Sequence, residues 1–200
     1  MKILITGNKG FVGKYFTEEL SELPNVNITG ADIKDGLDCR DLFKRDDTQY
    51  DLVIHLAAIV GGRESIEGRP LAVADNLSID SEFFQWCLKT KPRKIVYFSS
   101  SAAYPIDLQI NRDTRLKEFD INLKHPNGPD MTYGWSKLVG EYLSQFVPNV
   151  HIFAIVMRLV LSEAPAAAPP HYGKCVLKWR GVRGGGTHLS LSATALFTAR

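Results

Sequence analysis

A glycine-rich segment near the N-terminus constrains the fold most strongly. Residues 2–6 (KILIT) form an apolar run of the length of a buried strand, and Gly7, Gly10 and Gly13 follow at intervals of three. Apolar residues then recur at helical spacing over residues 11–20. Glycines at such a junction permit a tight turn and a close approach of the backbone to a phosphate. The segment therefore predicts the phosphate-binding turn of a βαβ unit, although glycines at this spacing also occur in ordinary loops.

The rest of the chain alternates between apolar runs of strand length and helical stretches. Further strands are predicted at residues 26–31, 51–56, 94–100 and 150–160, and further helices at 71–90 and 133–146. This alternation favours an α/β fold with a parallel sheet that is covered by helices on both faces. Because the connections between parallel strands are right-handed, the sheet is expected to be doubly wound.

An acidic residue follows the second predicted strand. Asp32 lies about twenty residues after the glycines, where a carboxylate can bind the adenosine ribose of a dinucleotide. A carboxylate there disfavours a 2′-phosphate, so the position favours NAD over NADP, although Lys34 or Arg40 could still reach such a phosphate. Since Lys34, Asp35 and Gly36 follow at once, the alternative is that Asp32 is a solvated turn residue.

Polar residues suited to proton transfer follow the fourth predicted strand. Residues 94–105 (KIVYFSSSAAYP) place three serines at the end of that strand, and Tyr133 and Lys137 lie four apart on one helical face. A lysine ammonium beside a tyrosine hydroxyl would lower the pKa of the phenol, which could then exchange a proton with a substrate oxygen. Alternatively, the serines satisfy backbone groups at the strand end, and the tyrosine and lysine form an ordinary surface pair.

In this order, the motifs resemble those of the extended short-chain dehydrogenases/reductases, the NAD(P)-dependent epimerases and dehydratases that act mostly on nucleotide sugars. TGNKGFVG is similar to their TGxxGxxG pattern, HLAAIVGG (55–62) to a segment that lines the cofactor, and YGWSK to YxxxK. The resemblance runs from residue 1 to about Arg158, and its details are most similar to GDP-L-fucose synthases. Ala102, however, stands where those enzymes carry a catalytic cysteine, so 4-keto reduction or C4 epimerisation remains open.

The resemblance implies an NAD-dependent enzyme with a Rossmann-like domain, and it implies roles for individual residues. Ser100, Tyr133 and Lys137 would be catalytic, with Ser99 and Ser101 as alternatives for the serine. Lys137 would also bind the nicotinamide ribose. The residues that would bind NAD, or alternatively NADP, are Gly7, Gly10, Gly13, Phe11, Val12, Asp32, Asp38, Leu56, Ala57, Ala58, Asn76, Tyr133 and Lys137.

Several other conspicuous residues are interpreted as core packing. His55 ends a strand, where a histidine hydrogen-bonded to its neighbours is favoured over a catalyst. Phe83, Phe84 and Trp86 lie on a predicted helix, and Cys87 is interpreted as a small buried hydrophobic residue.

The composition changes after residue 158. Residues 163–170 (EAPAAAPP) and 181–187 (GVRGGGT) are rich in residues that disfavour regular structure, and no acidic residue follows Glu163. We therefore expect an NAD(P)-binding domain over residues 1–158, followed by a divergent, poorly ordered segment over 159–200. The second, substrate-binding domain of the family would then be largely missing, and the alternative to an active enzyme is a dinucleotide-binding protein without turnover.

Charge and hydropathy narrow the classes of partner. The net charge of +2 favours neither nucleic acid nor a membrane surface, and the chain contains no apolar run of spanning length and no leader pattern. Three widely spaced cysteines, without metal-ligand spacing, indicate reduced thiols and a cytoplasmic protein. The expected partner is a nucleotide-sugar substrate, and a homodimer is one expected assembly because family members often pair through the YxxxK helix.

Overall fold

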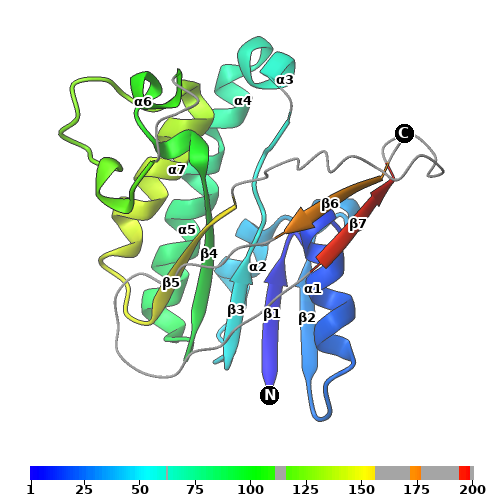
Figure 1. Cartoon of the computed structure of the whole chain (residues 1–200). Coiled ribbons are helices and arrows are strands. Elements are labelled where there is room, and N and C mark those ends of the chain that lie inside the picture. The colour runs from blue at the N-terminus through cyan, green and yellow to red at the C-terminus, as the bar shows by residue number, and fades with distance from the viewer. Residues whose placement is uncertain (62, 111–115, 156–171, 177–193, 199–200) are drawn as a thin grey trace.

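A five-stranded parallel sheet forms the centre of the molecule (Figure 1). This structure is a computed structural model that describes residues 1–61, 63–110, 116–155, 172–176 and 194–198. The strands lie in the order β2-β1-β3-β4-β5, which confirms the predicted doubly wound α/β fold. Their bounds are Lys2–Thr6 for β1, Asn27–Ala31 for β2, Leu52–His55 for β3, Ile95–Ser100 for β4 and Val150–Ile155 for β5.

The helices partly match the sequence analysis. They are α1 (Phe11–Ser21), α2 (Cys39–Arg45), α3 (Arg63–Gly68), α4 (Pro70–Ala74), α5 (Asn76–Thr90), α6 (Ile106–Ile110) and α7 (Met131–Ser144), with 3-10 turns η1 (Ile33–Asp35), η2 (Ser101–Ala103) and η3 (Glu118–Asp120). α1 and α7 were predicted, whereas α2 and the shorter helices were not. The single helix predicted over residues 71–90 divides at Asp75 into α4 and α5.

The C-terminal part contains a pair of strands that the sequence did not predict. β6 (Tyr172–Val176) and β7 (Thr194–Thr198) pair in antiparallel fashion as a separate two-stranded sheet. The remainder of the segment expected over 159–200 lies outside the described residues, as do residues 156–160 of the last predicted strand.

Helices cover both faces of the parallel sheet. On one face, Leu4 and Val53 pack with Phe43 of α2 and Phe83 of α5. On the other, Ile3 and neighbouring strand residues pack against the apolar side chains of α1. Successive strand residues thus point into opposite cores, as strand geometry requires.

The residues interpreted as packing are buried. Phe83, Phe84, Trp86 and Cys87 all belong to the larger core, and the ring of His55 stacks on Phe83 with 3.9 Å between centroids. These interpretations are confirmed. Cys39 and Cys87 are free thiols in the core, and burial raises the pKa of the Cys39 thiol to about 12. No helix in the described part of the chain is long and apolar enough to cross a membrane.

The strand order fixes where a ligand can enter. The chain passes from β1 to β2 on one side and then returns to β3 on the other side of β1. The order therefore reverses between β1 and β3, and a crevice opens beyond their carboxyl ends. The glycine-rich turn follows β1 at this crevice, and the HLAAIVGG segment follows β3.

Candidate functional site

The glycine turn is packed so closely that side chains do not fit. Gly7 has φ +71°, a left-handed conformation that favours glycine, and its N–H donates to the carbonyl of Ala31 at 2.7 Å. A Cβ on Gly7 would lie 2.9 Å from the backbone nitrogen of Ala57. A Cβ on Gly13 would lie 2.7 Å from Cα of Asn8 and would overlap the carbonyl oxygen of Gly7. The turn therefore packs closely against the backbone of the loop after β3.

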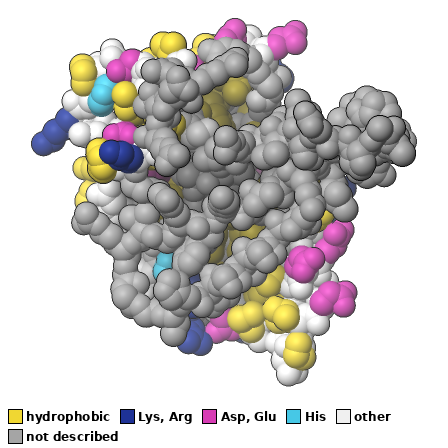
Figure 2. Space-filling view, in the orientation of Figure 1, with side chains coloured by type: hydrophobic (Ala, Val, Ile, Leu, Met, Phe, Trp, Pro, Cys, Tyr) yellow, Lys and Arg dark blue, Asp and Glu magenta, His cyan; other side chains and the backbone are white. Residues whose placement is uncertain are grey.

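The N-terminus of α1 has features that suit the binding of an anion. Gly10 caps the helix, no described side chain caps it there, and its first turn contains no acidic residue. The acidic residues of this segment, Glu18, Glu19 and Glu22, come later, and acidic side chains gather along the edge of the molecule where α1 lies (Figure 2). The first backbone N–H groups of a helix and its dipole attract phosphate when no carboxylate competes with it.

Asp32 connects the glycine turn to the loop after β2. Its side chain is buried, with Oδ2 accepting the N–H of Lys9 at 2.7 Å and Oδ1 that of Lys34 at 2.9 Å. The alternative of a solvated turn residue is therefore wrong. The ammonium of Lys34 in turn donates to the carbonyl of Lys9 at 3.0 Å, which fixes this cation beside the turn.

Arg40 is held between two carboxylates at the far wall of the site. Its guanidinium donates to Asp38 Oδ2 at 2.7 Å and to Asp75 Oδ1 at 2.9 Å. The hydrogen bond from Arg40 lowers the pKa of Asp38, and the same bond raises the pKa of Arg40. Both cations considered for a 2′-phosphate, Lys34 and Arg40, thus have protein partners. The sequence analysis did not anticipate this ion pair, because Asp75 is 35 residues away from Arg40.

Hydrogen bonds with Thr6 and Asn76 hold the loop after β3 in place. The N–H groups of Leu56 and Ala57 both donate to Thr6 Oγ1 at 3.2 Å. Asn76, which is 1% exposed, accepts the N–H of Ile59 at 2.6 Å and donates to its carbonyl at 2.9 Å. Asn76 was expected to bind the cofactor. In the structure its amide instead forms hydrogen bonds with the backbone of Ile59 and so holds the loop after β3 in place.

Ser100 and Tyr133 are brought together at the end of β4. Ser100 Oγ accepts the N–H of Ala102 at 3.2 Å and lies near the Tyr133 hydroxyl. α7 packs closely against the 3-10 turn η2, because a Cβ on Gly134 would overlap the carbonyl oxygen of Ala102. Ser99, one of the two alternatives, instead donates to the Glu141 carboxylate.

The protonation of Tyr133 differs from the expectation. Burial raises the pKa of the phenol above its ordinary value, and the nearby charge of Asp80 raises it further, while the neighbouring Ser100 hydroxyl lowers it. The expected net lowering of the Tyr133 pKa is therefore wrong for this structure. The Lys137 ammonium lies over the ring of Tyr97, 5.0 Å from its centroid, and is 3% exposed as a residue. The alternative of a surface pair is wrong as well.

One groove contains nearly all the predicted residues. It encloses about 790 Å³ and extends from the glycine turn to the end of β4. Among the predicted residues, its lining includes Gly7, Gly10, Phe11, Val12, Gly13, Asp32, Asp38, Leu56, Ala57, Ala58, Ser100, Tyr133 and Lys137. Asn76 is not part of this lining. The sequence analysis missed Ile33, Leu37 and Ile79, whose apolar side chains carried no signal beyond ordinary core packing.

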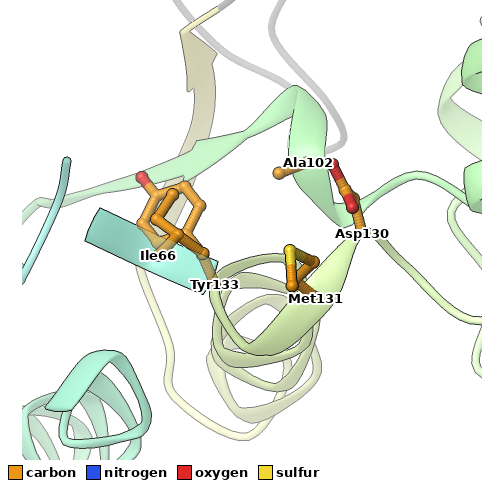
Figure 3. Close-up of a pocket in the computed structure, with 5 residues that line it drawn as sticks. All are labelled: Ile66, Ala102, Asp130, Met131 and Tyr133. Carbon is orange, nitrogen blue, oxygen red and sulfur yellow. The ribbon is translucent and has the colours of Figure 1, made fainter. Parts of the chain in front are cut away.

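A second, smaller pocket adjoins the groove at Tyr133. It has a volume of about 200 Å³ and is lined by Ile66, Ala102, Asp130, Met131 and Tyr133 (Figure 3). Met131 has φ +52°, an unusual conformation for a residue with a side chain, and such residues often lie at functional sites. Because Tyr133 lines both cavities, its side chain lies where they meet.

Comparison with known proteins identifies the family of this chain. The family model for the NAD-dependent epimerase/dehydratase family matches residues 3–180. The chain belongs to this family. The resemblance was predicted to end at about Arg158, whereas the family match extends to residue 180.

Relatives of the epimerase/dehydratase family share part of their length with this chain. A Methanocaldococcus jannaschii protein assigned as a UDP-glucose 4-epimerase is 30% identical over 160 residues, which cover 70% of this chain and 48% of the relative. The uncharacterized UDP-glucose epimerase YtcB of Bacillus subtilis is 26% identical over 198 residues, which cover 84% of this chain and 59% of YtcB. The chain thus spans about half the length of the curated relatives it matches.

Solved structures share the fold. A UDP-glucuronic acid 4-epimerase from Bacillus cereus, solved in complex with UDP-glucuronic acid and NAD, has a TM-score of 0.59 and 23% identity, covering 77% of this chain and 56% of its own. The UDP-glucose 4-epimerase of Thermus thermophilus, solved in complex with NAD, has a TM-score of 0.58 and 21% identity, covering 77% and 54%. The likeness to GDP-L-fucose synthases stays a prediction, since these four proteins are named as epimerases of UDP-sugars.

Proposed function

We propose that this chain forms the NAD-binding and proton-transfer part of an enzyme that epimerises, dehydrates or reduces a nucleotide sugar. The observation that supports this proposal is the continuity of the groove. Its glycine turn lies at one end and Ser100, Tyr133 and Lys137 lie at the other, within one cavity of about 790 Å³. A dinucleotide is an elongated ligand, and such a groove would bring its reactive end to these three side chains.

The described residues fit NAD. Gly10 places no side chain of its own at the N-terminus of α1, which suits a pyrophosphate. Asp32 would accept a hydrogen bond from the adenosine ribose, and Asp38 would lie near the adenine. Since Arg40 is already paired with two carboxylates and Asp32 adds a negative charge where the ribose would bind, NAD is favoured over NADP.

When bound, NAD would supply a hydride acceptor or donor for a carbon of the sugar. The side chains of this chain would handle the proton. Tyr133 is a phenol in the free chain because its pKa is raised, so its hydroxyl can donate a proton to a substrate oxygen. The Ser100 hydroxyl, which lies near that of Tyr133, would hold the same oxygen in place. A positive charge at Lys137 would stabilise the phenolate that remains after the transfer.

The small pocket beside Tyr133 would receive the sugar. Its lining is formed largely by apolar side chains and by Asp130, whose backbone N–H donates to the carbonyl of Ala102 at 3.3 Å. A volume of about 200 Å³ is suited to part of a substrate rather than to a whole nucleotide sugar. The epimerase relatives that match the chain support this substrate class, and the activity of the whole enzyme is part of the proposal.

The decisive test separates binding from turnover. Isothermal titration of the purified chain with NAD should show saturable binding, and a panel of UDP-, GDP- and dTDP-sugars should reveal turnover by reduced-nicotinamide absorbance or product analysis. Tyr133→Phe should lower turnover by about 10²–10⁴-fold, because the proton-transferring group is lost, while NAD affinity stays within about threefold. Tyr142→Phe, an exposed tyrosine of the same helix, is the matched control and should change neither value.

Each outcome of this test has a clear reading. Absence of NAD binding to the folded chain would contradict the proposal, and so would a Tyr133→Phe variant with unchanged turnover. NAD binding without turnover of any sugar in the panel would favour the alternative, a dinucleotide-binding protein that is not catalytic by itself.

A further inference from the structure

A network of buried polar groups lies behind the groove and takes no direct part in the proposed chemistry. Asp80 of α5 is 1% exposed, and its two oxygens have different partners. The Tyr97 hydroxyl donates to Oδ2 at 2.6 Å, and His55 Nε2 lies 3.3 Å from Oδ1. A carboxylate at this depth is costly unless hydrogen bonds and an opposite charge compensate it.

The hydrogen-bond pattern fixes the state of His55. Thr6 Oγ1 accepts the N–H groups of Leu56 and Ala57, so its own hydrogen is left to donate to His55 Nδ1 at 2.8 Å. Nε2 must then carry the ring proton and donate to Asp80. Burial also lowers the pKa of His55, which agrees with a neutral ring. Asp80 is thus connected, through hydrogen bonds, to the loop that lines the groove.

The opposite charge comes from Lys137 of α7. Its ammonium lies over the ring of Tyr97, the same residue whose hydroxyl binds Asp80, so this tyrosine contacts both charges. Burial lowers the pKa of Lys137, and the strongest opposing effect is the charge of Asp80, followed by that of Glu141. The titratable groups around Lys137 are Asp80 on α5, His55 on β3, Tyr97 on β4, and Tyr133 and Glu141 on α7.

The packing of α7 is adapted to this network. Gly140 lies three residues after Lys137, and a Cβ there would lie 2.9 Å from Asp80 Oδ2 and 2.6 Å from Cζ of Tyr97. A larger residue would therefore push the helix away from the carboxylate. The backbone of α7 at Gly140 therefore lies close to the side chains of Tyr97 and Asp80.

We propose that Asp80 is a positioning residue for Lys137: its buried carboxylate, fixed by Tyr97 and His55, supplies the countercharge that keeps Lys137 an ammonium beside the groove. The inference rests on the proposed function, in which that positive charge stabilises the Tyr133 phenolate. Asp80 itself lines neither cavity.

The test measures the ionisation of Lys137 directly by NMR. The chain is labelled with ε-¹³C lysine, the Lys137 signal is assigned with Lys137→Arg, and its pH titration is compared between wild type and Asp80→Asn. The midpoint should fall by about one pH unit or more in Asp80→Asn, because the countercharge is lost. Glu82→Gln removes a carboxylate two positions along the same helix, whose partner is Lys44, and should leave the midpoint unchanged.

A Lys137 signal that behaves alike in wild type and Asp80→Asn would overturn the inference. If Asp80→Asn does not fold, the double variant Asp80→Asn/Lys137→Met removes both buried charges and should fold again. Failure of the double variant as well would contradict the pairing. The titration uses neither NAD nor substrate. An unchanged Lys137 midpoint would therefore contradict the role of Asp80 without contradicting the proposed function. Conversely, a chain that does not bind NAD could still be used for the titration.

Discussion

The glycine turn and the side of α7 that packs against β4 both depend on glycine, but for different reasons. At the turn, a Cβ on Gly13 would meet only backbone atoms of residues 7–8, within one short segment of the chain. On α7, a Cβ on Gly140 would meet the side chains of Tyr97 and Asp80, which come from β4 and α5. The requirement at Gly13 is thus specified locally by residue spacing, whereas the requirement at Gly140 comes from side chains that are far apart in sequence.

The largest effect is expected at the turn. In Gly13→Ala the new methyl group overlaps backbone atoms that cannot move without opening the turn, so we expect destabilisation by about 3 kcal/mol or more and loss of NAD binding. Urea unfolding and NAD titration measure both effects. Gly68→Ala is the matched control, because its Cβ would meet nothing within 4 Å, and it should be close to neutral. A Gly13→Ala variant as stable as Gly68→Ala would refute the close packing of the turn.

A smaller effect is expected on α7. The Cβ of Gly140→Ala would collide with side-chain atoms of Tyr97, which can shift at the expense of its hydrogen bond to Asp80. We therefore expect a loss of about 1–3 kcal/mol in the free energy of unfolding, with NAD binding less affected than in Gly13→Ala. Urea unfolding again provides the measurement. Equal losses at Gly13 and Gly140 would remove the distinction between backbone and side-chain packing.

The smallest effect concerns the carboxylate of Asp38, which is paired with Arg40. The pKa of Asp38 is lowered in the folded chain by its hydrogen bond with Arg40, so its contribution to stability is complete above the unfolded value of about 3.9. That contribution is lost as the pH falls through the lower folded pKa. It amounts to about 1 kcal/mol or less, because both side chains are partly exposed and water screens them.

Urea midpoints of wild type and Asp38→Asn should therefore differ at neutral pH and converge as the pH falls below about 4. Asp41→Asn, which alters an exposed carboxylate 3.7 Å from Lys44, is the control and should track the wild type. A difference between wild type and Asp38→Asn that persists unchanged in acid would show that the ion pair with Arg40 is not its source.

The difference between the two regions also explains what the sequence could predict. All strands of the parallel sheet were found, because their apolar runs are long enough to be seen one at a time. α2 was missed, since its seven residues bury only Cys39 and Phe43 and offer too little periodicity. β6 and β7 were missed because each is only five residues long and lies near stretches rich in proline, alanine and glycine.

The candidate site shows the same division. The lining residues that follow β1 and β3 could be identified from short motifs, because strand ends and turn glycines are local features. The amide of Asn76 and the charges around Lys137 could not, since their partners come from distant segments that only the folded chain brings together. For the same reason the direction of the Tyr133 pKa shift was wrong: burial, which no motif records, outweighs the other effects.

The central claim is that one groove presents NAD to Tyr133, and a crystal structure of the chain with NAD tests it most directly. We expect the pyrophosphate on the turn from Gly7 to Gly13, the adenine beside Asp38, and the nicotinamide beside Tyr133 and Lys137. A bound nicotinamide that points away from Tyr133, or a dinucleotide seated outside the groove, would contradict the account.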